Sequence, residues 1–414
     1  MKNTRIVVLM SVLTGVVVGP SPAAEFMLGK LAVDVHGFVS QGYLQSDRNN
    51  FLAETEAGTF DFREYGLNLS SNLTEKLYVG AQAFGRSLGE LGENKPVLDW
   101  AVADYRFKDW LGVRAGRLKI GLGLYNETRD IDMVRTGVFL PESLYNDAFR
   151  ESFTAMNGVG LYGVLSFEAL GSFSYQAQYG QIKIEPAGGL SKFLNNFIPM
   201  DISQVETSPV FLAGAEWVPA PPFDGLRLRW TWNTWDMDDT AATNASPFWQ
   251  FQGVPPGLPL SYHADLSVTT LSVEYRWRDL VLAAEMFAPG GYKNQLKSPV
   301  LGTLLDDSPD KYGWYVSAAY RFTQWFELGL TYSDYSNNRH DRDGKIIEAN
   351  LRYPRYAAWL KDATLNARFD IGDHWVIKAE GHVMDGTDIM LMADNPEGVD
   401  QHWFLFAGKV TYSF

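Results

Sequence analysis

Apolar and polar residues alternate along several stretches of the chain with a period of two. The alternation is cleanest in residues 172–179, 271–277, 314–322 and 362–370. In the first stretch, for example, Phe173, Tyr175 and Tyr179 interleave with serine and glutamine. A period of two indicates β-strands, in which successive side chains point to opposite faces, and not helices. Stretches of about ten residues with this pattern are typical of strands that cross a bilayer, with one face towards lipid.

The segments between these stretches fall into two classes that alternate along the chain. Seven short turns lie around residues 71–75, 108–110, 167–169, 219–225, 278–279, 323–324 and 371–374. Eight longer polar segments lie near residues 45–59, 87–96, 120–155, 183–208, 236–264, 290–310, 336–355 and 385–400. Fifteen connections predict sixteen strands. An even strand number, with tight periplasmic turns and long external loops, is the arrangement of bacterial outer-membrane barrels. We therefore predict an all-β, sixteen-stranded antiparallel transmembrane barrel.

Large aromatic residues collect beside the short turns. The residues that we expect to form a periplasmic aromatic girdle are Trp110, Trp217, Trp277, Trp325, Trp375 and Phe414. Amphipathic rings are favoured at the level of the lipid headgroups. In a soluble β-protein the aromatic residues would pack in the core and would not follow one class of turn.

The first 23 residues have the order of a secretory signal peptide, with Lys2 and Arg5 before an apolar run and small residues up to Ala23. We expect a periplasmic N-terminal segment over residues 24–33 and the barrel over residues 34–414.

The chain of 414 residues has no cysteine, which excludes disulfides and thiolate metal sites. Its formal charge of −14 argues against nucleic-acid binding. After residue 18 no apolar run is long enough for a membrane-spanning helix.

Three segments resemble Gram-negative outer-membrane porins, and most closely the phosphate-selective type. They are the opening strand His36–Leu44, the stretch Arg114–Asn126, and the end of the chain, where Phe414 follows Tyr412. The resemblance implies an outer-membrane location among lipid and lipopolysaccharide, and recognition of Phe414 by the barrel-assembly machinery. It also implies that the protein could form a homotrimer.

Sixteen strands leave an aqueous channel inside a barrel, so we predict passive diffusion of small polar or charged solutes. In porins the third long loop folds inward and narrows the channel, and residues 120–155 form the longest connection here. The expected constriction residues are Glu127, Arg129, Asp130, Asp132 and Arg135. The expected basic residues on the facing wall are Arg86, Arg106 and Arg114. Opposed charges across a narrow waist would orient polar solutes.

Two alternatives stay open at this point. A phosphate-type anion channel would need a one-sign ladder of Arg and Lys, but Arg276, Arg368 and Lys378 each have an acid two residues away. A structural barrel that sheathes a partner, such as a multihaem protein, would need a wider lumen and therefore more strands.

We expect neither an enzyme nor a cofactor, because no nucleophile is placed beside a histidine in a catalytic pattern. Two acidic clusters contain the carboxylates that a cation site would need, namely Asp236, Asp238 and Asp239, and Asp341, Asp343 and Glu348. Neither has the spacing of a calcium loop, so we expect both on solvated loops and predict no metal site.

Overall fold

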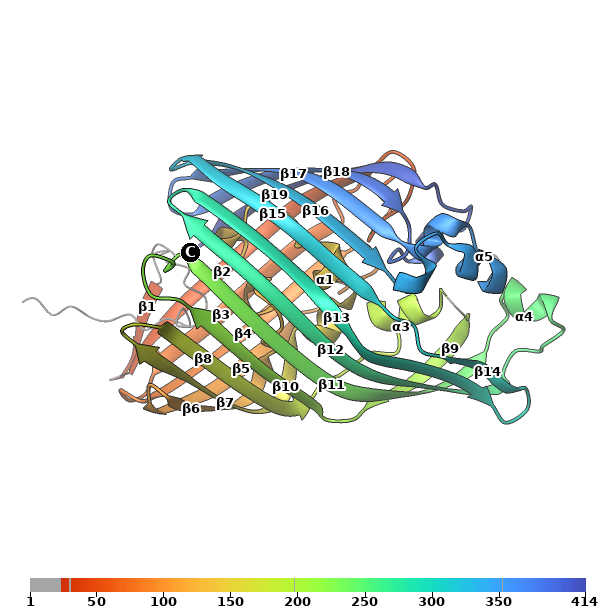
Figure 1. Cartoon of the computed structure of the whole chain (residues 1–414), viewed down its shortest axis with the longest axis horizontal. Helices are drawn as coiled ribbons and strands as arrows, with labels where there is room; N and C mark the ends of the chain where they lie inside the picture. Colours follow the sequence, from red (N-terminus) through yellow and green to blue (C-terminus); the bar gives the residue numbers. More distant parts are fainter. Residues whose placement is uncertain (1–23, 30, 197, 352) are drawn as a thin grey trace, which may run out of the picture.

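The computed structural model describes residues 24–29, 31–196, 198–351 and 353–414, and its strands form one antiparallel sheet (Figure 1). The predicted signal peptide, residues 1–23, lies outside the described residues. Sixteen strands make a closed barrel. They are β2 (Leu31–Ser46), β3 (Phe62–Asn72), β4 (Leu77–Leu88), β5 (Val97–Lys108), β6 (Leu111–Lys119), β7 (Ala155–Phe167), β8 (Gly171–Gln181), β10 (Val210–Val218), β11 (Leu226–Thr243), β12 (Pro259–Trp277), β13 (Leu280–Ser298), β15 (Tyr312–Thr323), β16 (Phe326–Ser336), β17 (Leu360–Ile371), β18 (Trp375–Gly386) and β19 (His402–Ser413).

The barrel closes where the last strand meets the first barrel strand. β19 pairs with β2, in a register that sets Leu405 opposite Ser46 and Ser413 opposite Phe38. The backbone of Phe414 continues this seam by two hydrogen bonds with Gly37, of 3.1 and 3.0 Å. The predicted strand number and closed antiparallel architecture are thus confirmed.

Three further strands extend the sheet beyond the barrel. β1 (Ala24–Leu28) forms a hairpin with β2, β9 (Met200–Thr207) pairs with β11, and β14 (Gly302–Asp307) pairs with β13.

The described helices are short pieces in the long connections. They are α1 (Glu142–Tyr145), α2 (Arg150–Phe153), α3 (Gly189–Leu194), α4 (Pro247–Phe251) and α5 (Lys345–Leu351), with 3-10 turns η2 (Asn126–Thr128), η3 (Asp132–Val134), η4 (Asp147–Phe149), η5 (Arg339–Asp341), η6 (Arg355–Ala358) and η7 (Met392–Asp394). Within the described ranges, no helix has the length and apolarity needed to cross a membrane.

Short turns and long connections alternate around the barrel as predicted, so one end carries all seven short turns and the other all eight long connections. The predicted bounds of two long segments were wrong. Residues 236–243 and 259–264 belong to β11 and β12, and residues 290–298 belong to β13. The reason is the pairing: β9 and β14 supply backbone partners above the barrel, so polar residues there remain in strands.

The two faces of the strands differ as the alternation predicts. On β12, Leu271 and Val273 are exposed while Ser272 and Glu274 are buried. In the other three alternating stretches the inward-facing set is, on the whole, more buried than the outward-facing set. In a closed barrel the exposed apolar face is the outer surface, and the buried face lines the interior.

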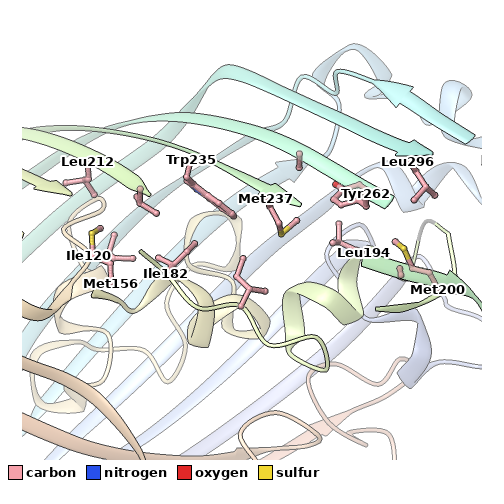
Figure 2. Packing of buried hydrophobic residues seen from close by; sticks show 14 of the residues in the cluster. Ile120, Met156, Ile182, Leu194, Met200, Leu212, Trp235, Met237, Tyr262 and Leu296 are labelled. Carbon is pink, nitrogen blue, oxygen red and sulfur yellow. The ribbon is translucent and has the colours of Figure 1, made fainter. Parts of the chain in front are cut away.

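The interior itself has two halves of different character. In the long-loop half the inner face is apolar, and side chains of the connections cover it. One apolar cluster joins Trp235 and Tyr262 of the wall to Ile182 and Leu194 of the β8–β10 connection (Figure 2). A second cluster includes Trp403 and residues of four long connections. Charged residues occupy the region between this apolar half and the short turns.

Candidate functional site

The connection between β6 and β7, residues 120–154, carries the predicted constriction residues and makes many contacts with buried wall side chains. Its backbone is a series of short pieces: η2, η3, α1, η4 and α2. Its hydrogen bonds and ion pairs reach strands that are far apart around the barrel, including β4, β12, β13, β16, β18 and β19. The segment contains only helical pieces of three or four residues. Hydrogen bonds and ion pairs of its side chains therefore hold its backbone in position.

Asp132 is enclosed by cations from both the connection and the wall. Its carboxylate lies 3.3 Å from Lys378 Nζ on β18, 2.7 Å from Lys409 Nζ on β19 and 3.2 Å from Arg135. The hydroxyl of Thr411 donates a further bond of 2.7 Å. Burial acts to raise the pKa of Asp132, but the three cations outweigh it and hold the pKa well below its ordinary value.

A second anchor lies on β18, next to the first. One oxygen of Glu380 accepts the backbone N–H of Val138 at 2.7 Å. The other oxygen lies 2.7 Å from His382 Nε2, and His382 Nδ1 lies 2.9 Å from Asp362 on β17. His382 therefore connects Asp362 of β17 to Glu380, the residue that holds the backbone of Val138.

A third anchor lies on β13, four barrel strands away from β18. Glu285 of β13 accepts the hydroxyl of Tyr145 at 2.5 Å and the N–H of Leu124 at 2.8 Å. The wall residues Tyr315 and Ser272 each donate to the same carboxylate at 2.6 Å. Four donors on one buried carboxylate hold the connection and two neighbouring strands together.

The remaining predicted constriction residues are also paired. Arg129 donates to the carbonyl of Tyr145 at 3.1 Å and lies 3.2 Å from Asp147. Asp130 pairs with Lys119 and accepts from Gln82 at 2.5 Å, and Glu127 lies 3.4 Å from Arg229 on β11. Each of these charges is therefore compensated at close range.

The three predicted wall residues behave differently from one another. Arg86 is buried and pairs with the connection, at 2.6 Å from Glu151 and 3.4 Å from Asp147. Arg114 pairs instead with Asp104 on the adjacent strand at 2.7 Å. Arg106 lies near the short-turn end of β5.

Ion pairs along the wall follow the sequence pattern in two of three cases. Arg276 lies 2.8 Å from Glu274, and the same distance separates Arg368 from Asp370. In the third case, Lys378 pairs with Asp132 of the connection and Glu380 pairs with His382. The wall is thus lined by pairs of opposite sign.

The aromatic residues named in the sequence analysis lie at the short-turn end. The exposed ones are Trp110, Trp277, Trp325, Trp375 and Phe414. Trp217 is half-buried because it stacks on Phe173 at 5.7 Å between ring centres, and its indole N–H donates to the carbonyl of Leu170.

The two acidic clusters considered as cation sites are explained by local structure. Asp236, Asp238 and Asp239 lie in β11 and not on a loop, because β12 pairs with all three and β9 pairs with Asp238 and Asp239 on the other side. Asp341 accepts the N–H groups of Ile346 and Ile347 at the start of α5, both at 2.8 Å. In the part of the chain that the structure describes, no three His, Asp or Glu side chains are grouped to hold a metal ion.

Sequence reasoning missed four anchoring residues, namely Glu285, Glu380, His382 and Lys409. All four occupy inward positions of their strands, so strand parity was a signal that could have singled them out. Their partners on the connection could not be found in this way, because irregular backbone has no repeating geometry.

Comparison with known proteins gives matches in structure alone. No protein-family profile matches the sequence, and no curated protein matches it. OmpF of Salmonella typhi in complex with daunomycin superposes with a TM-score of 0.56 at 12% identity, over 94% of this chain and 100% of that chain. The outer-membrane channel DcaP of Acinetobacter baumannii gives 0.54 at 9% identity, over 94% and 100%. The anion-selective porin of Comamonas acidovorans gives 0.51 at 13% identity, over 93% and 100%. The chain has the sixteen-stranded barrel fold of Gram-negative outer-membrane porins.

Proposed function

We propose that the protein is an outer-membrane porin that passes small polar or charged solutes by diffusion, with residues 120–154 as the constriction inside the lumen. The observation that carries the proposal is the set of anchors on these residues. Asp132 bonds to β18 and β19, and Tyr145 bonds to β13, all through side chains on the buried faces of the strands. Anchoring by inward-facing groups on separated strands supports a position of the segment within the barrel, where it would reduce the bore.

The paired charges favour weak ion selectivity. A phosphate-type channel needs unpaired cations along the solute path, but Arg114, Arg276 and Arg368 each have an acid within ion-pair distance. A sheath around a partner protein needs an empty lumen, which the same anchors argue against. We also propose no catalytic role.

The same proposal sets the orientation of the barrel. The short turns would face the periplasm, with the exposed tryptophans at the headgroup level as a girdle. The long connections would then face outside, among lipopolysaccharide. Phe414 would be the signal for the assembly machinery, and a homotrimer is the expected assembly.

Deletion of residues 126–146 tests the constriction. We expect single-channel conductance in planar bilayers to rise several-fold, because the deletion removes Asp132 and Tyr145 together with the segment between them. The control replaces residues 297–304 by Asn-Gly, a two-residue turn that suits the directly paired Leu296 and Leu305. That control should conduct like the wild type. A deletion variant with unchanged conductance, in a correctly folded barrel, would refute the proposed constriction.

A further inference from the structure

The connection between β8 and β10 begins with a segment that is separate from the proposed constriction. We call residues 182–196, which include α3, the cap. Its side chains Ile182, Ile184, Phe193 and Leu194 are all buried. Three of them belong to the apolar cluster that covers the inner wall beneath Trp235 and Tyr262 (Figure 2).

The cap reaches the opposite side of the barrel. Asn196 Nδ2 donates to the carbonyl of Met390 at 2.6 Å, and Asn196 Oδ1 accepts the N–H of Met392 at 2.9 Å. Met390 and Met392 lie in the connection between β18 and β19. Around the closed ring, eight strands separate the β8–β10 connection from the β18–β19 connection in either direction. Met390 is fully buried, so the β18–β19 connection also reaches inward, and the two connections joined at Asn196 together span the mouth.

Further contacts hold the cap from below and from the sides. Gly189 lies against the backbone of Ala148, so closely that an added Cβ would lie 1.9 Å from the Ala148 oxygen. The ring of Phe193 packs edge-on against Phe149 at 5.1 Å. At the rim, the Tyr353 hydroxyl donates to the Asn196 carbonyl, and Lys192 pairs with Glu90.

The chemistry of the inner wall explains why the cap is closed. Apolar side chains that face an open aqueous mouth would lose the free energy of burial, about 25 cal/mol for each Å² exposed. The cap covers such side chains, while its link to the far rim consists of hydrogen bonds at Asn196. Apolar packing would thus favour closure, and a small number of polar bonds would fix the far end.

We propose that residues 182–196 form a cap that controls which solutes enter the channel, and that Asn196 is the latch holding it across the mouth. The inference rests on the proposed function, because a cap controls access only if the barrel conducts. While it is latched, passage is limited to small ions and solutes. Release at Asn196 lets the cap move and admits larger ones.

The chain offers a matched pair of variants for a test. Asn196→Ala removes the two side-chain bonds to the far rim. Asn49→Ala removes an equivalent pair of side-chain bonds, one donated to and one accepted from the backbone of Asp400, both of 2.8 Å. These bonds join connections that are neighbours around the rim. Gly189→Ala provides a second way to displace the cap, because the new Cβ cannot fit against Ala148.

The first measurement uses thiol accessibility, which does not depend on conduction. Ser191 lies in α3 and is 1% exposed, and the protein has no cysteine of its own. Folded Ser191→Cys protein in detergent is treated with a membrane-impermeant thiosulfonate. With Asn196→Ala added, we expect labelling about thirtyfold faster, equivalent to about 2 kcal/mol for two hydrogen bonds. With Asn49→Ala the rate should not change.

The second measurement is permeation in liposomes, with glucose, sucrose and raffinose as probes of increasing size. We expect Asn196→Ala and Gly189→Ala to admit larger sugars than wild type and Asn49→Ala do. Equal labelling and equal size limits in all variants would overturn the cap. If labelling responds but neither the wild type nor the 126–146 deletion conducts ions, the cap stands as a structural element and the proposed function fails.

Discussion

Asp132 shows how much of the interior depends on single charges. Two lysines from neighbouring strands and one arginine from its own connection share its carboxylate. Removing one member of a buried ion pair leaves an uncompensated charge, at a cost of about 3–5 kcal/mol. This cost would weaken the attachment of residues 120–154 to the wall. The barrel itself would keep its strand pairing, because the backbone hydrogen bonds of the strands do not involve this side chain.

We therefore expect Asp132→Asn to loosen the connection while the barrel remains intact. Trypsin should cleave after Arg129 or Arg135 much faster than in wild type, and the temperature at which the band shifts on a semi-native gel should not change. A cleavage rate equal to that of wild type would contradict this role of Asp132.

Glu142 provides the comparison within the same connection. Its carboxyl is buried, one oxygen accepts the Asp147 N–H at 3.0 Å, and the other has no partner among the described residues. Burial, reinforced by the negative charge of Asp147, raises the pKa of Glu142 well above its usual value. Glu142→Gln should consequently leave the trypsin cleavage rate at the wild-type level.

Strands show where an alternating pattern is informative and where it is not. On β15, Val316 is exposed on the outer face and Ser317 is on the inner face, as the sequence predicts. On β19 both faces are apolar, since Trp403 and Leu405 are buried inside while Phe404 and Phe406 are exposed. The strand could be predicted from the sequence, but the apolar interior of the long-loop half could not, because connections distant in sequence cover it.

The strand face gives the second prediction. In the proposed membrane-spanning barrel, Val316→Arg places a cation on the lipid-facing surface and should destabilise the fold by about 2–4 kcal/mol near the bilayer midplane. Ser317→Arg changes the adjacent inward position and should destabilise much less. Urea unfolding in vesicles measures both variants. Equal destabilisation by the two would show that the faces are assigned wrongly.

At the scale of the whole molecule, several buried acids act together on one connection. Burial would raise the pKa of Asp130, but Lys119 and Arg150 outweigh it and lower the pKa to about 2. The pKa values of Asp132, Asp147 and Glu151 are likewise lowered, by cations that outweigh burial. A carboxyl whose pKa is lowered in the folded state contributes fully to folding stability when the pH is above its ordinary pKa, about 4. This contribution is lost as the pH falls through the folded-state pKa.

The third prediction follows from that sign. Conductance should stay constant between pH 7 and pH 5, where these acids are ionised in both states. It should rise below about pH 4, as protonation releases residues 120–154 from the wall. Bilayer recordings across this range measure it, and the 126–146 deletion, which lacks Asp130 and Asp132, should show a weaker rise. A step near pH 6 would point to other groups.

The order of the strands has a consequence for assembly. Every barrel strand pairs with the barrel strands that precede and follow it in the chain, except at the seam between β19 and β2. Hairpins can therefore add one after another with little entropy lost to loop closure, and one distant pairing remains. In the proposed membrane-spanning barrel, two strand edges stay unpaired until the last strand arrives, and hydrocarbon offers them no other hydrogen-bond partner. A chain truncated before β19 should accordingly yield no partly functional pore.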